Sequence, residues 1–179
     1  MLLLILDSST ERGLVAISRD NEIIFERQLP FGHNHSQYII PTVDEGLNHC
    51  GLELKEFDGI AVGIGPGSYT GIRVGAAVAK GLSFASKLPL VGICSLKAFV
   101  PKTEGLFASI IDAKMGGAYL LCGEKTSSAV HYLTDPEVYP LIEVKKYLKG
   151  CTRLITPSNK RLLVELERLH PLTPWEWEE

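Results

Sequence analysis

A block of glycine and other small residues constrains this chain more than any other feature. It reads GIGPGSYTGIR over residues 63–73, between an apolar, β-branched stretch at 59–64 and an apolar stretch at 70–86. This order predicts a buried strand that opens onto a glycine loop and then a long helix. Such a loop can hold an anion at the helix N-terminus, or it can let backbone segments approach closely. The loop matches neither the Walker A nor the GxGxxG pattern, because Ile72 follows Gly71 and residue 68 is serine, so the packing role is favoured.

The helix predicted after this loop has a line of small residues along one side. They recur at every fourth position: Gly71, Gly75, Ala79 and Ser83. A helix that is apolar or small almost all round is buried on several sides, and a small-residue line lets another helix approach closely. That neighbour is either the helix predicted at residues 36–50 or, as we favour, a second polypeptide. On the second hypothesis, Gly75→Leu would block association by pushing the helices apart.

An apolar strand, an aspartate, a polar turn, a glycine and another apolar strand occur twice along the chain. The first copy contains Asp7 and the second contains Asp112. The repetition indicates either two structurally related lobes or two ordinary hairpins. Strands and helices together predict an α/β fold. The strands are predicted at residues 2–6, 13–18, 22–29, 59–64, 90–93, 107–111 and 117–122, and the helices at 36–50, 70–86, 138–148 and 158–169.

Composition excludes several classes of protein. A chain of 179 residues that is 45% hydrophobic can form one compact domain or two small lobes. The net charge of −3 disfavours a direct grip on tRNA or DNA, since neutralising phosphates requires a basic face. No stretch approaches the roughly 20 apolar residues that a bilayer-spanning helix needs. The four cysteines are scattered singly, which is typical of a reducing compartment, so the chain is predicted to be cytoplasmic.

Residue patterns for catalysis are sparse. His33 and His35 have HxH spacing in a predicted loop, but the chain contains no HExxH, so solvent-facing histidines are favoured and no metal is predicted. Asp7 and Asp112 each follow a buried strand, where a carboxylate can hold a metal-bound nucleotide phosphate or simply form the turn. No further base or phosphate-clamping cation can be assigned, and no nucleophile elbow is present. No catalytic residue is therefore predicted.

Five segments together resemble the TsaB (YeaZ) family of bacterial subunits that take part in making threonylcarbamoyladenosine in tRNA. In chain order they are LLILDSST, NHSQYIIPTVDEGL, AVGIGPGSYTGIRVGAAVAKGLSFA, GICSL and the weaker IIDAKMGGAYL. The resemblance implies an α/β fold of the actin/hexokinase/Hsp70-like (ASKHA) class. It divides the chain into an N-terminal lobe with partner-binding helices over residues 1–100 and a smaller C-terminal lobe over 101–179. Because the chain is shorter than is usual in the family, we expect a reduced second lobe.

The resemblance also implies partners. The family forms a helix bundle with the catalytic subunit TsaD, and the ATPase TsaE joins the complex. This chain is thus expected to be a non-catalytic subunit for modification of ANN-decoding tRNA. It would contact tRNA only indirectly and form a homodimer when TsaD is absent. The implied interface residues lie on two helices: Tyr38, Ile39, Val43, Leu47, Gly71, Gly75, Ala79 and Ser83.

No cofactor is expected beyond weak ATP or ADP binding at the heterodimer junction, with Asp7, Ser9 and Thr10 as candidate nucleotide or phosphate contacts. Two alternatives stay open. One is a small ATP-dependent phosphotransferase of the same fold, motivated by Asp7 and the glycine loop. The other is a metalloprotease, an older description of the wider family.

The chain departs from its relatives on the first predicted helix and in the second lobe. TsaD-like relatives carry metal-binding histidines spaced HxxxH on the first helix, whereas Tyr38 and Ile39 stand where a second ligand would follow His35. Catalysis is therefore not carried over. In the second lobe, Lys114 replaces an arginine of the family pattern, and Gly117-Ala118-Tyr119 replaces its acid-Val-Tyr step, so we assign no ligand role to that loop.

Overall fold

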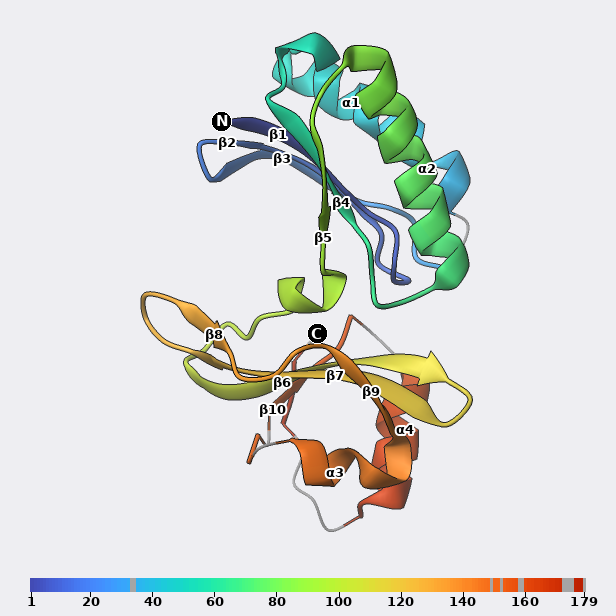
Figure 1. Cartoon of the computed structure of the whole chain (residues 1–179), viewed down its shortest axis with the longest axis vertical. Helices are drawn as coiled ribbons and strands as arrows, with labels where there is room; N and C mark the ends of the chain where they lie inside the picture. The colour runs from blue at the N-terminus through green and yellow to red at the C-terminus, as the bar shows by residue number, and fades with distance from the viewer. Residues whose placement is uncertain (33–34, 149, 152, 158–159, 172–175, 179) are drawn as a thin grey trace. The chain divides into compact units, whose positions relative to one another are not determined.

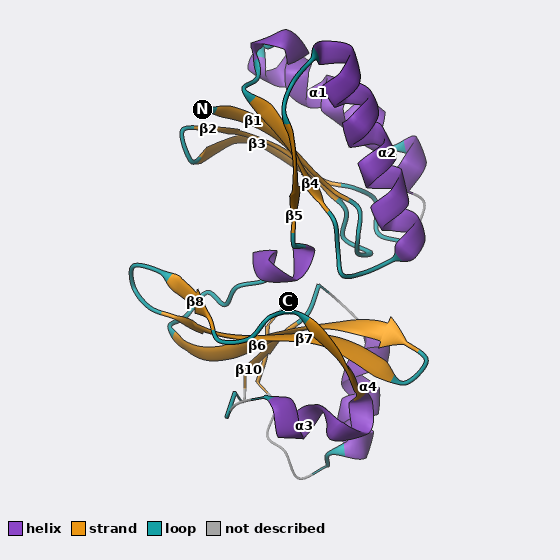
Figure 2. Cartoon of the chain, viewed as in Figure 1, coloured by secondary structure: helices purple, strands orange, loops and turns teal. Residues whose placement is uncertain are grey.

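The structure is a computed structural model that describes residues 1–32, 35–148, 150–151, 153–157, 160–171 and 176–178. The chain divides into two compact units, Met1–Ser95 and Leu96–Glu179. The sequence placed this division between residues 100 and 101. Each unit contains one β-sheet, with helices against one face of it (Figure 1, Figure 2). None of the helices in the described part of the chain is both long and apolar enough to cross a membrane.

The first unit contains a five-stranded sheet in the order β3-β2-β1-β4-β5. The first three strands form an antiparallel meander, while β4 is parallel to β1 and β5 is parallel to β4. Asp20 and Asn21 make the tight turn from β2 to β3, since both have positive φ angles, 51° and 71°. The strands are β1 (Leu2–Asp7), β2 (Leu14–Arg19), β3 (Glu22–Gln28), β4 (Gly59–Gly63) and β5 (Leu90–Ile93).

Two helices, α1 (Ile39–Cys50) and α2 (Tyr69–Ser86), cover the same face of this sheet (Figure 1). The sequence predicted a helix from residue 36, with Pro41 causing either a kink or a late start. The helix does begin late, which puts Pro41 in its first turn, where a missing N–H breaks no helical hydrogen bond. Ser68 caps α2, because its hydroxyl accepts a hydrogen bond from the Gly71 amide at 3.2 Å.

The second unit contains a sheet in the order β11-β10-β6-β7-β8, with β9 also paired to β7. Residues 138–140 belong to β9 rather than to the predicted helix at 138–148, so that part of the prediction is wrong. Pairing with β7 decides their conformation. Of the helix predicted at 158–169, residues 158 and 159 lie outside the described residues. The elements are β6 (Gly105–Lys114), β7 (Gly117–Lys125), β8 (Val130–Tyr132), β9 (Glu137–Pro140), α3 (Val144–Tyr147), β10 (Arg153–Ile155), α4 (Lys160–Leu169) and β11 (Glu176–Glu178).

The second sheet repeats the arrangement of the first. Strands β6 and β7 are antiparallel neighbours, as are β1 and β2. Strand β10 lies parallel to β6, as β4 lies parallel to β1, and β11 extends the sheet as β5 does. Helix α4 follows β10 as α2 follows β4. The repeated strand–Asp–turn–strand pattern of the sequence therefore reflects two related units, not two isolated hairpins.

Candidate functional site

The glycine loop between β4 and α2 packs against the turn that follows β1. A Cβ atom on Gly67 would lie 2.1 Å from the carbonyl oxygen of Ser9, and one on Gly71 would lie 2.0 Å from that of Ser8. The Ser68 amide donates to the Ser9 carbonyl at 2.6 Å, and the Ser8 hydroxyl donates to the Gly71 carbonyl at 2.8 Å. The glycines thus allow two backbone segments to meet, which supports the packing role of the loop.

The candidate nucleotide contacts Asp7, Ser9 and Thr10 lie together in this turn. The Asp7 carboxylate accepts the Ser9 amide at 2.7 Å and covers Gly63, whose added Cβ would lie 2.1 Å from Asp7 Oδ2. Ser9 is fully buried, and its Oγ has no hydrogen-bond partner among the described residues. Thr10 Oγ1 accepts the Arg12 amide at 3.3 Å. A phosphate here would meet the Asp7 carboxylate, so it would need a bridging cation.

The line of small residues on α2 faces the unit's own sheet, which corrects the interface prediction for Gly71, Gly75 and Ala79. A Cβ on Gly75 would lie 2.6 Å from Ser8 Oγ and 3.7 Å from Val62 Cγ2 of β4. Ala79 is completely buried in the core. Small residues let a helix approach a sheet as closely as another helix, and periodicity alone does not say which neighbour is present.

Two further interface predictions on α1 are also wrong. Ile39 and Val43 are 2% and 4% exposed and belong to the core beneath the helix, so a partner does not reach them. They lie one helical turn apart, on the face that packs against the sheet. Tyr38, Leu47 and Ser83 remain at least partly exposed, and their place in an interface stays a prediction.

The surface that α2 does expose was missed by the sequence interpretation. Its members lie on one side of the helix, roughly opposite the small residues, and we call them the outer stripe: Tyr69, Arg73, Ala77, Lys80 and Phe84. Tyr69 and Phe84 are 73% and 89% exposed. The Arg73 guanidinium lies 5.3 Å from the centre of the Tyr69 ring. Two aromatic residues about four turns apart, among glycines and alanines, were the signal that could have identified this face.

Helix α1 adds apolar surface. Ile40 is 48% exposed, and Tyr38 precedes it at the start of the helix. The two helices contact each other and run side by side on the sheet (Figure 1). Exposed apolar residues on two adjacent helices are typical of a protein–protein interaction site.

The histidines do not form a metal site in the described part of the chain. No group of three or more His, Cys, Asp or Glu side chains lies close enough to hold an ion among those residues. His35 was predicted to face solvent, yet it is 2% exposed and packs so tightly that a Cβ on Gly13 would lie 2.7 Å from its Nδ1. That prediction is wrong, because the short turn before α1 folds into the core. His33 lies outside the described residues.

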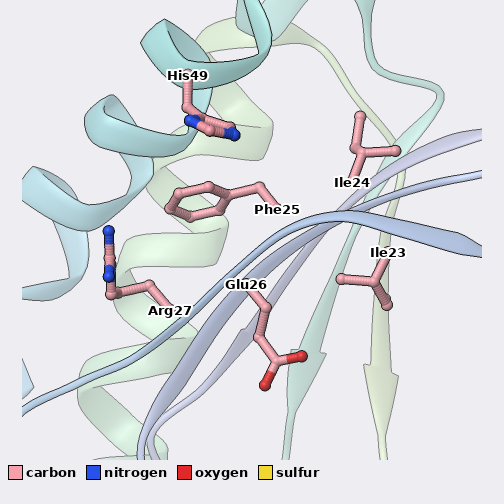
Figure 3. Close-up of a pocket in the computed structure, with 6 residues that line it drawn as sticks. All are labelled: Ile23, Ile24, Phe25, Glu26, Arg27 and His49. Carbon is pink, nitrogen blue, oxygen red and sulfur yellow. The ribbon is translucent and has the colours of Figure 1, made fainter.

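A shallow hollow lies away from the glycine loop, beside the edge strand β3 and the last turn of α1 (Figure 3). The Phe25 and His49 rings face each other there, with centroids 5.7 Å apart. Arg27 forms a salt bridge with Glu45 of α1. The hollow has a volume of about 310 Å³ and is lined by Ile23, Ile24, Phe25, Glu26, Arg27 and His49. None of the residues predicted from the sequence as site residues lines it.

A solved structure shares this architecture. It is "YeaZ from Pseudomonas aeruginosa", which superimposes with a TM-score of 0.75 at 24% sequence identity and covers 94% of this chain and 91% of that chain. The likeness, with the strand order β3-β2-β1-β4-β5 and its repetition, defines a two-lobed α/β protein of the actin/hexokinase/Hsp70-like class. The predicted fold class is confirmed, while the expected reduction of the second lobe stays a prediction.

Sequence comparisons identify the family. The family model described as "TsaD: tRNA N6-adenosine threonylcarbamoyltransferase" matches residues 30–148. The "tRNA threonylcarbamoyladenosine biosynthesis protein TsaB" of Haemophilus influenzae is 39% identical over 125 residues, and that of Bacillus subtilis is 33% identical over 122. Each match covers 66% of this chain but only 52–53% of the relative, so the chain matches about half the length of these relatives. The chain belongs to the TsaB (YeaZ) family, within the wider group that the TsaD model describes.

Proposed function

We propose that the chain is a non-catalytic subunit of the machinery that makes threonylcarbamoyladenosine in ANN-decoding tRNA. Family membership supports the pathway, since the curated relatives are named as biosynthesis proteins for this nucleoside. Two residues support the non-catalytic role. Ile39 is buried in the core at the position where TsaD-like relatives would carry a second metal-binding histidine, and His35, at the first, is buried as well.

The partner we propose is TsaD, which would pack on the outer stripe of α2 together with Tyr38 and Ile40 of α1. The single observation that carries this proposal is the exposure of two aromatic side chains, Tyr69 and Phe84, on one face of one helix. Exposed aromatic residues are enriched at the energetic centres of interfaces. A helix of TsaD laid along the stripe would bury both rings and complete a bundle.

The same face would serve the other associations. With TsaD absent, a second copy of the chain would cover the stripe as a homodimer. TsaE would join the TsaD complex, and tRNA would be held mainly by the partners, because this chain has a net charge of −3. The placement in the cytoplasm rests on the scattered cysteines and stays part of this proposal.

The test introduces a negatively charged side chain into the outer stripe. Phe84→Asp is expected to weaken binding to TsaD roughly 30-fold or more, since a central aromatic contact is worth about 2 kcal/mol or more. Formation of threonylcarbamoyladenosine in a reconstituted assay would fall with it. The thermal midpoint should hold, because the ring is 89% exposed and leaves no cavity.

The matched control is Val164→Asp on α4, a 64% exposed apolar residue on a helix of the second unit. It is expected to bind TsaD as the unchanged chain does. Full binding by the Phe84 variant, or equal loss in both variants, would refute the outer stripe as the contact surface.

We propose further that any nucleotide contact of Asp7, Ser9 and Thr10 is weak and needs a bridging cation. Calorimetric titration with Mg-ATP should show no turnover by the isolated chain. Micromolar binding with phosphate release by the chain alone would favour the phosphotransferase alternative, for which Asp7 at the end of β1 is the supporting observation. Asp7→Ala would then have to abolish that turnover.

A further inference from the structure

Two buried cysteines of the second unit lie in one apolar cluster between its sheet and its helices. Cys122 is on β7, and Cys151 is in the turn before β10. The Cys151 thiol donates to the Phe107 carbonyl at 3.1 Å, and the Cys122 thiol donates to the Tyr147 carbonyl at 3.4 Å. Phe107 precedes Ala108, the cross-strand partner of Cys122 on β6. Pairing with β6 therefore brings the two thiols to the same part of the cluster.

The two side chains also interact with each other. The interaction with the Cys122 side chain is the largest cause that lowers the pKa of the Cys151 thiol. A lower pKa raises the fraction of thiolate, which is the form that attacks oxidants and disulfides. Cys122 is therefore placed to stabilise a reactive Cys151 and then to attack it.

We propose that Cys122 and Cys151 form a reversible disulfide that fixes the turn before β10 to strand β7 when the chain meets a peroxide. The Cys151 thiolate would attack one oxygen of hydrogen peroxide and form a sulfenic acid, and the departing hydroxide takes up the thiol proton as water. The Cys122 thiol then attacks the sulfenic sulfur, so the S–S bond forms and a second water leaves. Two thiols lose two electrons in total, peroxide is reduced to two waters, and an added dithiol reverses the bond by exchange.

Access to the pair depends on the short elements around Cys151, since Cys122 is completely buried and Cys151 is 3% exposed. Helix α3 is a single turn of four residues, and β10 has three residues. Short elements of this kind open locally at a small fraction of the cost of global unfolding. Closing the bond would tie together the segment from Cys122 to Cys151, which contains β8, β9 and α3, and would lower the entropy of its unfolded state.

The experiment treats the whole chain with hydrogen peroxide, alkylates it without reduction and maps the peptides by mass spectrometry. The expected product links Cys122 to Cys151, while Cys50 and Cys94 of the first unit remain alkylated. The thermal midpoint should rise by about 5–10 °C and return after dithiothreitol. A Cys50→Ser, Cys94→Ser double variant should behave as the unchanged chain does.

Cys122→Ser should abolish both the link and the rise in midpoint. Should that variant fail to fold, Cys122→Ala keeps the cluster apolar and serves the same purpose. A sulfinic acid on Cys151 beside an alkylated Cys122, a link that involves Cys50 or Cys94, or a bond between two chains would each overturn the proposal.

Discussion

The two units share a strand arrangement but differ in the helices attached to it. In both, an aspartate at or near the end of the first strand accepts the backbone amide two residues later at 2.7 Å, Asp7 from Ser9 and Asp112 from Lys114. Yet α2 of the first unit has 18 residues, whereas the corresponding α4 has ten. The strand pattern thus specifies the frame of each unit, and the surface offered to a partner depends on the helices.

The helices also pack differently. Helix α2 approaches its sheet through glycine and alanine and leaves its aromatic residues outside. Helix α4 instead places leucines in the core, with Leu162 and Leu166 almost completely buried. Because α2 packs on its sheet through small residues, its large side chains are free to form a binding surface. This difference in helix packing distinguishes the first unit from the second.

The largest expected effect comes from disrupting the close approach of α2 to the turn that follows β1 in the first unit. Gly71→Ala should cost about 3 kcal/mol or more of the free energy of unfolding, because its Cβ would lie 2.0 Å from a backbone oxygen. Urea denaturation measures the loss. Gly81→Ala on the same helix is the control, since its Cβ would meet nothing within 4 Å, and it should stabilise the chain by up to about 1 kcal/mol. Equal effects at the two positions would contradict the packing described here.

Gly75→Leu is expected to act on the fold rather than on the partner alone. The added side chain would press on Ser8 and Val62 beneath the helix, so the isolated chain should lose about 2–3 kcal/mol of stability. Thermal unfolding without TsaD measures this. A variant that stays fully stable and loses only TsaD binding would restore the sequence interpretation in which the small residues face the partner.

A smaller effect is expected at the aspartate turn that the two units share. Asp7→Ala and Asp112→Ala should each cost about 1 kcal/mol, because each leaves one turn amide without its acceptor. Asparagine at either position keeps an acceptor oxygen and should recover most of the loss in a denaturant series. If only Asp7→Ala lowers stability, the two turns share a geometry, but their hydrogen bonds contribute differently to the free energy of unfolding.

The smallest effect is expected in the titration of a tyrosine of the second unit. The Tyr139 hydroxyl donates to Glu137 Oε2 at 2.7 Å, and this hydrogen bond is the main cause that raises the pKa of Tyr139 to about 12. The neutral phenol is favoured in the folded state, so its contribution to stability is complete below the unfolded pKa of about 10 and is lost as pH rises through about 12. Ultraviolet difference titration should find one late-titrating tyrosine, and Glu137→Gln should lower its pKa. An unchanged titration would show that Glu137 is not responsible.

Much of the frame could be predicted from the sequence because local signals define it. Apolar runs, the turn at Asp20 and Asn21, and the position of Pro41 predicted the strands and helices of the first unit to within a few residues. Strand β9 could not be predicted, because its conformation depends on pairing with β7, a segment well before it in the chain.

The candidate site was harder to predict for a related reason. Periodicity groups Gly71, Gly75 and Ala79 on one face of a helix but does not say whether a sheet or another chain lies against it. The same helical periodicity, applied to the opposite face of the helix, would have placed Tyr69 and Phe84 on one exposed surface. His35 was mistaken for a loop residue, because nothing local to it shows that its turn folds into the core.

Backbone amide exchange along the chain, measured with and without TsaD, tests most directly whether the outer stripe binds the partner. We expect slower exchange over α2 and the first turn of α1 when TsaD is present, and unchanged exchange over α4. Protection that falls on the second unit, or α2 amides that exchange equally fast in both samples, would contradict the claim that the outer stripe is where the partner binds.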